Sequence, residues 1–258
     1  MVFVFGFFIS RADHYRMRLL LLFIDEPIPG NVLPELAREI GDIKSSHYYK
    51  AMLEVMLRQL QGLENCRIRF CYSPPDAGDA TKFWLLPKMS ATACETDNVY
   101  VTSNAQLKGP QKQEIDFRPQ GEGSIAQRLK RAFSEGFSDG YTAIATVDPT
   151  CIECGARWIN ASFAQFHKQT SRDTLIGPGT RGNSYMIALK SQASELFQEI
   201  RQTNQDFMSI SESKAQQTGR NIELLPPLST MSSLSDWQRL LDTPLGPALK
   251  KALGEPTH

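Results

Sequence analysis

Short runs of apolar residues alternate with amphipathic stretches along most of the chain, from Arg18 to about Leu225. The apolar runs have the length of strands, and in the stretches between them apolar side chains recur at helical spacing. Strands that pair in parallel need a crossover connection, which is usually a helix. The pattern therefore predicts an α/β fold with three layers, α/β/α, around a mostly parallel sheet.

The strands and helices that this pattern predicts can be placed by residue range. We expect strands at residues 18–24, 66–72, 115–119, 141–147, 174–178, 184–189 and 222–225. We expect helices at residues 49–60, around 83–85, and at 125–137, 156–167, 209–217 and 237–241. The glycine-rich loop at residues 179–183 predicts a hairpin or a tight excursion of the chain. The polar residues 88–112 predict an irregular insertion with one strand candidate around residues 99–101.

The length of 258 residues is one that open α/β sheets reach as a single domain of about 250 residues. We therefore expect one domain over residues 17–258. Residues 1–16 form a separate N-terminal extension, because Met17 directly precedes the first buried strand. This extension is either a start-site artefact or a short extra edge strand.

Charge and cysteine content exclude several classes of protein. Lys plus Arg and Asp plus Glu both number 28, so no net charge attracts nucleic acid or an anionic membrane. The apolar residues 2–9 lack a preceding basic segment and are far shorter than the roughly 20 residues that span a bilayer. An odd number of cysteines, 5, disfavours a disulfide scaffold. We expect reduced thiols and a cytoplasmic protein without a membrane span.

Cys151 and Cys154 form a single C-x-x-C motif near a predicted helix start, where the helix dipole would lower the pKa of a thiol. Zinc normally needs a second pair of ligands, and no Cys or His follows at suitable spacing. We favour two small, partly buried cysteines and leave a redox role open. The 4 histidines lack i, i+4 spacing, so we expect no histidine-based metal centre.

In open α/β sheets ligands bind at the carboxyl ends of the strands, so the loops that follow predicted strands are the candidate site. After the first strand, two prolines and a glycine give a rigid loop that could approach a ligand closely at Pro29 and Gly30. An ordinary strand-to-helix turn is the alternative. Asp148 ends another strand and could hold a divalent cation, although aspartate is also common in turns.

The loop at residues 120–124 precedes a helix for which Ser124 is the expected N-cap. Its free backbone N–H groups, at Gly121 and Gly123 among others, could hold a phosphate, and a plain helix cap explains the sequence equally well. The glycine-rich loop at residues 177–183 could cover a bound ligand or simply turn a hairpin.

Taken in order, these loops resemble a bacterial family of glycosyltransferase-A-like nucleotide-diphospho-sugar transferases, the radical-SAM-associated transferase family of unknown function. The likeness covers about Met17 to Leu241. The family's Gln-Gly-x-Gly-Asp-Leu-Gly-x-Arg-Met resembles residues 120–129, and its Gly-x-Asp-x-Pro is reduced to residues 146–150, which keep Asp148. Its Gly-Pro-x-x-Asp-Gly-Gly-Tyr-Tyr-Leu-Ile resembles residues 177–187. The resemblance implies the nucleotide-diphospho-sugar transferase fold.

The chain departs from the family at charged positions. The family's first loop is Lys-x-Pro-x-Pro-Gly-x-x-Lys-Thr-Arg-Leu, and its three basic positions hold Asp25, Leu33 and Glu35 here. Arg181 replaces an acid of the family, and its later Asp-Val-Asp-Thr is replaced by residues 230–233. Three cations that could neutralise a diphosphate are lost, so we expect poor phosphate affinity at this loop.

The resemblance implies a glycosyltransferase that takes a sugar from a nucleotide sugar, with reduced or no activity. The residues expected at nucleotide or phosphate are Pro29, Gly30, Gln120, Gly121, Gly123, Ser124 and Arg128. Asp148 would hold Mg²⁺ or Mn²⁺, and a loop with Gly177, Arg181, Gly182 and Tyr185 would cover the ligand. A catalytic residue, the acceptor and the oligomeric state cannot be assigned. A non-catalytic nucleotide-binding or assembly module without a cofactor is the second hypothesis, and a nucleotidyltransferase is the third.

Overall fold

The structure, a computed structural model, describes residues 18–94, 114–168, 173–197, 213 and 217–254. In these parts seven strands form one sheet in the order β3-β2-β1-β4-β6-β5-β7. Strand β1 pairs in parallel with β2 and β4, whereas β6 pairs antiparallel with both β4 and β5. The reversed strand β6 therefore interrupts a sheet that is otherwise parallel.

The strands are β1 (Arg18–Asp25), β2 (Cys66–Ser73), β3 (Ile115–Pro119), β4 (Ala143–Val147), β5 (Thr174–Pro178), β6 (Ser184–Leu189) and β7 (Ile222–Leu224). The helices are α1 (Pro34–Ile40), α2 (Asp42–Gln59), α3 (Gly78–Cys94), α4 (Ile125–Ser138), α5 (Ala156–Lys168), the 3-10 helix η1 (Ser194–Phe197), α7 (Leu234–Leu241) and α8 (Gly246–Leu253).

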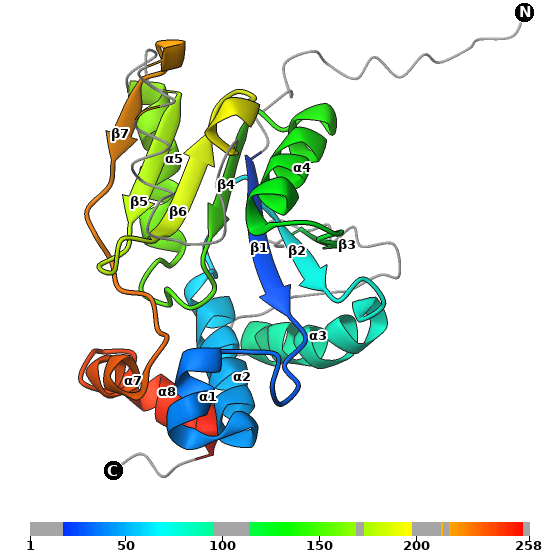
Figure 1. The fold of residues 1–258 in the computed structure, drawn as a ribbon, viewed down its shortest axis with the longest axis vertical. Helices are drawn as coiled ribbons and strands as arrows, with labels where there is room; N and C mark the ends of the chain where they lie inside the picture. The colour runs from blue at the N-terminus through cyan, green and yellow to red at the C-terminus, as the bar shows by residue number, and fades with distance from the viewer. Residues whose placement is uncertain (1–17, 95–113, 169–172, 198–212, 214–216, 255–258) are drawn as a thin grey trace, which may run out of the picture.

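The two faces of the sheet carry separate apolar cores, because side chains alternate along each strand. Leu20 and Leu22 of β1 belong to a core that includes residues of α2 and α5. Leu19 and Leu21 belong to a second core, which α4 and η1 cover on the other face. The arrowheads of β1 and β2 in Figure 1 point towards α1 and α3. The carboxyl edge of the sheet therefore lies at this end of the molecule.

The predicted three-layer α/β/α class is confirmed, and so are the seven strands and the hairpin between β5 and β6. The prediction of an irregular insertion is wrong for residues 88–94, because α3 continues beyond Pro87 to Cys94. Helix α1 was not expected, because it buries only Leu36 and has no side-chain cap. Helix α8, which packs on α2, was also not expected.

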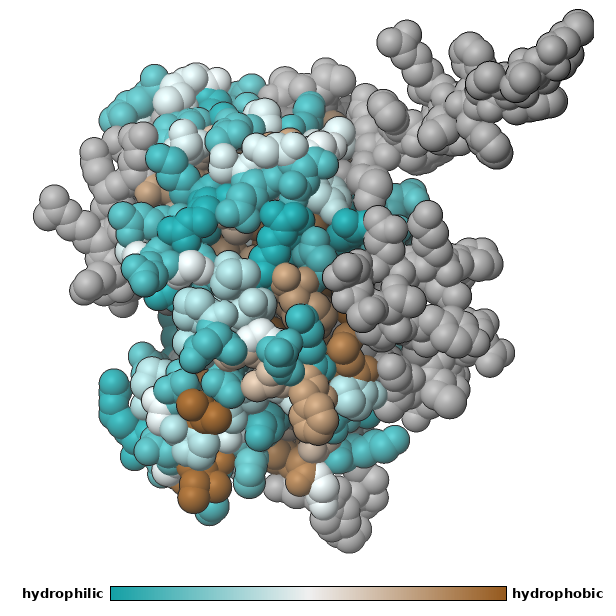
Figure 2. Space-filling view, turned by 90° about the vertical axis from the view of Figure 1, so that its right-hand side faces the viewer, coloured by the Kyte–Doolittle hydropathy of each residue, from teal (hydrophilic) through white to brown (hydrophobic). Residues whose placement is uncertain are grey.

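Several expectations fall outside the described residues, namely the extension 1–16, the strand around 99–101 and nearly all of the helix at 209–217. The division into that extension and one domain over 17–258 stays a prediction. Among the described residues, no helix combines the length and the apolar character needed to cross a membrane. The face drawn in Figure 2 is mostly hydrophilic in its upper half and has separate apolar patches below.

A buried cation joins β2, β3 and α4 at the edge of the second core. The side chain of Arg69 is 1% exposed and makes two hydrogen bonds with Asp116, at 2.8 and 2.9 Å. It also contacts Asp139, at the end of α4, at 2.8 Å. The guanidinium lies 5.9 Å from the centre of the Tyr141 ring. These contacts tie the edge strand β3 and the end of helix α4 to strand β2.

We predict that Arg69→Met destabilises the protein by about 3 kcal/mol, because it leaves two carboxylates without their buried partner. Chemical denaturation measures the change. Lys82→Met is the matched control, because the pair of Lys82 with Asp79 is exposed and should contribute less than about 1 kcal/mol. Equal effects of the two substitutions would contradict this role of Arg69.

Candidate functional site

A cavity of about 350 Å³ opens at the carboxyl ends of β1 and β4, between α2 and α4. Its polar lining comes from Asp25, Tyr49, Gln120, Arg128, Thr146, Asp148, Thr150, Ser184 and Tyr185. Its apolar lining comes from Phe23, Val32, Leu33, Ile125, Ala126, Leu129, Val147, Pro149, Met186 and Ile187. The cavity thus combines an apolar wall with a few polar groups, as small-molecule sites commonly do.

Asp148 follows β4 and is held by hydrogen bonds around the turn. Its Oδ1 accepts the Thr150 N–H at 2.9 Å and the Thr150 hydroxyl at 2.7 Å. Its backbone N–H donates to the carbonyl of Tyr185 in the reversed strand β6. Its Oδ2 has no hydrogen-bond partner among the described residues. Burial raises the pKa of this carboxyl, and the bonds from Thr150 oppose the rise only in part. The second oxygen of a fixed carboxyl is therefore left for a ligand.

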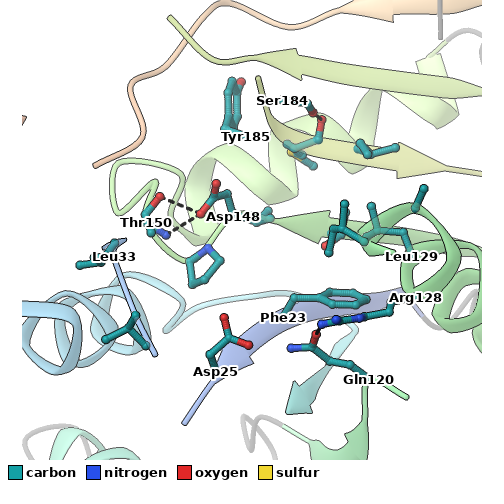
Figure 3. Close-up of a pocket in the computed structure, with 18 of the residues that line it drawn as sticks. Phe23, Asp25, Leu33, Gln120, Arg128, Leu129, Asp148, Thr150, Ser184 and Tyr185 are labelled. Atoms are coloured by element: carbon teal, nitrogen blue, oxygen red, sulfur yellow. Dashed lines mark hydrogen bonds between the residues drawn. The ribbon is translucent and has the colours of Figure 1, made fainter. Parts of the chain in front are cut away.

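Asp25, at the end of β1, lines the cavity opposite Asp148 (Figure 3). Partial burial raises its pKa, while Arg128 and Gln120 act in the opposite direction. The backbone N–H of Asp25 donates to the hydroxyl of Tyr49, from α2, at 3.1 Å. The cavity therefore holds two carboxylates with raised pKa values and a single guanidinium.

Gln120 joins three strands and a helix at the carboxyl edge. Its side-chain nitrogen donates to the carbonyls of Ile24 and Cys71, at 3.1 and 3.0 Å, where β1 and β2 end. Its side-chain oxygen accepts a hydrogen bond from Arg128 at 2.9 Å. Both amide hydrogens are therefore committed to backbone carbonyls. Gln120 lines the cavity, but its amide positions Arg128 instead of having a hydrogen free for phosphate.

The turn before α4 is built as the sequence predicts. Ser124 caps the helix, since its hydroxyl accepts the N–H of Gln127 and the Gln127 side chain accepts the N–H of Ser124. Gly121 and Gly123 have φ values of 72° and 104°, and a Cβ at Gly121 would lie 1.9 Å from Arg131 Nη1. Three residues of this turn, Gly121, Gly123 and Ser124, lie next to residues of the cavity lining but are not part of it.

The loop after β1 contributes apolar groups, whereas Pro29 and Gly30 lie outside the cavity lining. Gly30 has φ 88° and no atom within 4 Å of a Cβ, so the turn itself requires the glycine. Leu33 lines the cavity with φ 49°, a left-handed conformation that is unusual for leucine. The hydroxyl of the buried Ser45 donates to the carbonyl of Val32 at 3.1 Å and fixes this loop to α2.

The hairpin between β5 and β6 places only Tyr185 of its predicted residues in the cavity lining. Gly177 packs behind it, because a Cβ there would lie 2.3 Å from the Tyr185 ring. Gly182, with φ 82°, forms the turn. The Tyr185 hydroxyl accepts the Trp158 indole N–H at 3.1 Å and donates to the carbonyl of Pro226 at 2.9 Å. Gly177 and Gly182 thus support Tyr185 from outside the cavity.

Arg181 also lies outside the cavity lining and forms a charged cluster with α7 and α1. Its guanidinium contacts Asp236 at 2.9 Å and Glu35 at 3.7 Å, and it donates to the hydroxyls of Ser232 and Ser233. Two positions where the charge departs from the family, Glu35 and Arg181, therefore compensate each other. The hairpin loop is tied to these helices in this structure instead of lying over the cavity.

Cys151 and Cys154 are completely buried in the core against α5 and carry free thiols. They are buried more deeply than the expected partly buried pair. Burial raises the pKa of both thiols, so both stay protonated at neutral pH. This state disfavours a redox role and metal ligation.

The sequence interpretation missed most contributors to the cavity, among them Asp25, Tyr49, Phe23 and Thr150. Tyr49 was assigned to the apolar stripe of its helix, where its ring does lie, but its hydroxyl reaches the strand ends. The pattern places Phe23 in a buried strand and Thr150 in a turn, and it gives neither residue a role in the site. A tyrosine at the end of an apolar helical stripe, near a predicted ligand edge, is the signal that could have identified Tyr49.

The two kinds of carboxylate in this region predict opposite effects on stability. The pKa of Asp148 is raised in the folded state, so its ionised form lowers the stability once the pH rises above the unfolded value near 3.8. We predict that Asp148→Asn is more stable than the natural protein at pH 7. The gain should shrink as the pH falls towards 4. Thermal unfolding from pH 4 to pH 8 measures it.

Asp236 provides the matched control for this measurement. Hydrogen bonds from Ser232 and Ser233 lower its pKa against the opposing effect of burial, and Arg181 adds to them. Its contribution to stability is present above pH 3.8 and is lost as the pH falls through the lowered pKa. Asp236→Asn should therefore be less stable at pH 7. A loss of stability in Asp148→Asn at pH 7 would contradict the assignment of Asp148 as a desolvated ligand group.

Three solved structures have related folds. A "putative nucleotide-diphospho-sugar transferase" from Desulfovibrio desulfuricans G20 is 21% identical, with a TM-score of 0.71, over 92% of this chain and 96% of that one. The 4-diphosphocytidyl-2C-methyl-D-erythritol synthase from Anaerococcus prevotii DSM 20548 is 9% identical, with a TM-score of 0.50, over 86% of this chain and 92% of that one.

The third is glucosyl-3-phosphoglycerate synthase from Mycobacterium tuberculosis, solved with Mn²⁺, uridine diphosphate and phosphoglyceric acid. It is 10% identical, with a TM-score of 0.48, over 95% of this chain and 81% of that one, and is too distant to inform the chemistry here. At these identities the first two likenesses show the fold alone, the nucleotide-diphospho-sugar transferase type that the loops predict. No functionally curated protein matches the chain.

A family model matches residues 56–204, more than half of the chain. The matched range includes the turn before α4, Asp148 and the hairpin between β5 and β6. Together with the fold of the transferase from Desulfovibrio desulfuricans, this match confirms the family resemblance drawn from the loops. The chain belongs to the family described as "Uncharacterized protein conserved in bacteria (DUF2064)".

Proposed function

We propose that this chain binds a nucleotide-diphospho-sugar in the cavity at the carboxyl edge of the sheet and transfers its sugar. One observation carries the proposal: the Asp148 carboxylate is fixed by Thr150, with its second oxygen open to a cavity that also holds Arg128. Ligands of open α/β sheets bind at this edge. Fold likeness to nucleotide-sugar transferases supports the class of ligand.

The residues of the cavity could hold a divalent cation only together with a bound ligand that supplies the remaining coordinating oxygens. The described residues contain no group of three or more His, Cys, Asp or Glu side chains placed to hold a metal. Magnesium, however, is commonly held by one or two carboxylates together with phosphate oxygens and water. Asp148 Oδ2 and the Asp25 carboxylate are such donors. A bound Mg²⁺ or Mn²⁺ would neutralise charge on the departing nucleoside diphosphate.

The phosphate groups themselves would lie towards α4. The N–H groups of Gly121, Glu122 and Gly123 donate to no other described residue, and they precede the positive end of the helix. Arg128 donates through Nε to the carbonyl of Gly123 at 2.8 Å and through Nη1 to Gln120, which leaves Nη2 for an anion. We propose these groups as the phosphate contacts, with Gln120 and Ser124 positioning them.

A non-catalytic nucleotide-binding module is the second candidate, and one observation favours it. Leu33 lines the cavity at a position where the family resemblance expects a lysine, and Glu35 is committed to Arg181. The cavity therefore offers a diphosphate fewer cations than a transferase of the resembled type. Transfer or hydrolysis of a nucleotide sugar by the natural protein, but not by Asp148→Ala, would exclude the non-catalytic function.

We predict that a nucleotide sugar together with Mn²⁺ raises the melting temperature, whereas Mn²⁺ alone does not. The probes are UDP-, GDP-, CDP- and ADP-glucose. Ligand at about 100 times its Kd stabilises by about 2.7 kcal/mol, which corresponds to a rise of roughly 5–10 °C for a chain of this size. The dependence on both components follows from a cation site that the diphosphate completes.

Two variants make this measurement specific. Asp148→Asn should lose the metal-dependent part of the shift, because an amide neutralises no cation charge. Asp236→Asn should keep the full shift, because Asp236 lies outside the cavity lining. The proposal fails if none of the four nucleotide sugars shifts the melting temperature with Mn²⁺ or Mg²⁺, or if Asp148→Asn responds like the natural protein.

A further inference from the structure

The residues that line the cavity include several with hydroxyl groups, and these hydroxyls differ in whether the protein supplies an acceptor for their hydrogen. Thr146 donates to the carbonyl of Leu21 at 3.2 Å, and Ser184 donates to the carbonyl of Met186 at 2.9 Å. Thr150 donates to Asp148, and Tyr185 donates to the carbonyl of Pro226. These four hydroxyls are therefore committed to acceptors within the protein.

Tyr49 is the exception among the cavity hydroxyls that the structure describes. Its oxygen accepts the N–H of Asp25 at 3.1 Å, but no described residue accepts its phenolic hydrogen. The residue is 4% exposed and its ring packs in the apolar core, so the side chain is held in place. A fixed donor without a protein acceptor faces a cavity, where only a ligand or water can accept its hydrogen.

The surroundings of this hydroxyl restrict the kind of ligand oxygen that it meets. Burial raises the pKa of Tyr49 most, and the charges of Asp25 and Asp148 raise it further. The phenol is therefore neutral, and both carboxylates lie within electrostatic reach of it. An anionic phosphate oxygen that reached this point without the cation would be repelled by two carboxylates. A neutral oxygen would not be repelled by them.

A sugar hydroxyl has the chemistry that matches these groups. It accepts one hydrogen bond, which Tyr49 offers, and donates another, which a carboxylate oxygen of Asp25 or Asp148 that the cation leaves free can accept. The ring of Phe23 lines the same cavity but lies beside the Arg128 side chain (Figure 3), so it belongs to the other side of the cavity. Arg128, the cation, comes from α4 beside Gln120 and is left for the phosphates.

We propose that Tyr49 is a specificity-determining residue that donates a hydrogen bond to the sugar of the bound ligand, between the carboxylates of Asp25 and Asp148. This inference rests on the function proposed above and adds a division of the cavity. The sugar occupies the side of Tyr49, and the diphosphate occupies the side of Arg128 and the turn before α4.

Isothermal titration calorimetry with Tyr49→Phe tests the proposal. Each nucleotide sugar, UDP-, GDP-, CDP- and ADP-glucose, is titrated with Mn²⁺ beside its own nucleoside diphosphate. For a pair that binds, the variant should lose about tenfold in affinity for the nucleotide sugar, the effect of one hydrogen bond, and less than about twofold for the diphosphate. A merely structural role of Tyr49 would weaken both ligands alike.

Tyr185→Phe is the matched control, because it removes the hydroxyl of another tyrosine of the cavity lining, one that is committed to Trp158 and Pro226. It should lower the melting temperature without changing the affinity ratio of nucleotide sugar to diphosphate. Equal losses for both ligands in Tyr49→Phe, or no loss for the nucleotide sugar, would overturn the proposal.

A second measurement separates this proposal from the proposed function. Saturation-transfer NMR with glucose, galactose and mannose probes the sugar side without a nucleotide. If the natural protein binds no nucleotide sugar but shows a monosaccharide signal that Tyr49→Phe loses, the transferase proposal fails and the sugar contact stands. If neither kind of ligand binds to the natural protein, both proposals fail.

Discussion

The hydrogen bonds of the Gln120 side chain organise the carboxyl edge of the sheet. A single amide donates to the carbonyls of Ile24 and Cys71, near the ends of β1 and β2, and accepts from Arg128 of α4. These bonds fix the end of β1, where Asp25 stands, relative to the helix that supplies the only guanidinium in the described cavity lining. On the opposite side, the backbone of Asp148 is bonded to the reversed strand β6. The separation of the two carboxylates from Arg128 thus follows from how the strand ends are tied together.

The charges around the cavity have been redistributed relative to the family that the loops resemble. Basic positions of the first loop hold Asp25, Leu33 and Glu35, and an acid of the hairpin is replaced by Arg181. Glu35 and Arg181 pair outside the cavity, where they join the hairpin to α1 and α7. The cavity retains two carboxylates with raised pKa values and Arg128. A diphosphate ligand would therefore have to bring a cation with it, which distinguishes this site from one with a preformed basic loop.

The sequence predicted the fold better than the site, for physical reasons. Strand burial and helical spacing are local patterns, so all seven strands and the cap at Ser124 could be placed in advance. Helix α1 could not, because a helix that buries one leucine has almost no pattern. The contacts of Gln120 with Ile24 and of Tyr49 with Asp25 join residues far apart in the chain, and only the folded arrangement reveals them. The pairing of Glu35 with Arg181 also joins residues far apart in the chain. In the sequence alone, each of the two positions shows only that a charge of the resembled family has been replaced.

The central claim is that the cavity between Asp25, Asp148 and Arg128 holds a nucleotide-diphospho-sugar with a cation. A crystal structure of the protein with a nucleotide sugar and Mn²⁺, recorded with anomalous scattering, tests it most directly. The account predicts an anomalous peak in contact with Asp148 Oδ2, the diphosphate beside Arg128 and the sugar beside Tyr49. A nucleotide bound elsewhere on the protein, or Mn²⁺ bound away from Asp148, would contradict the account.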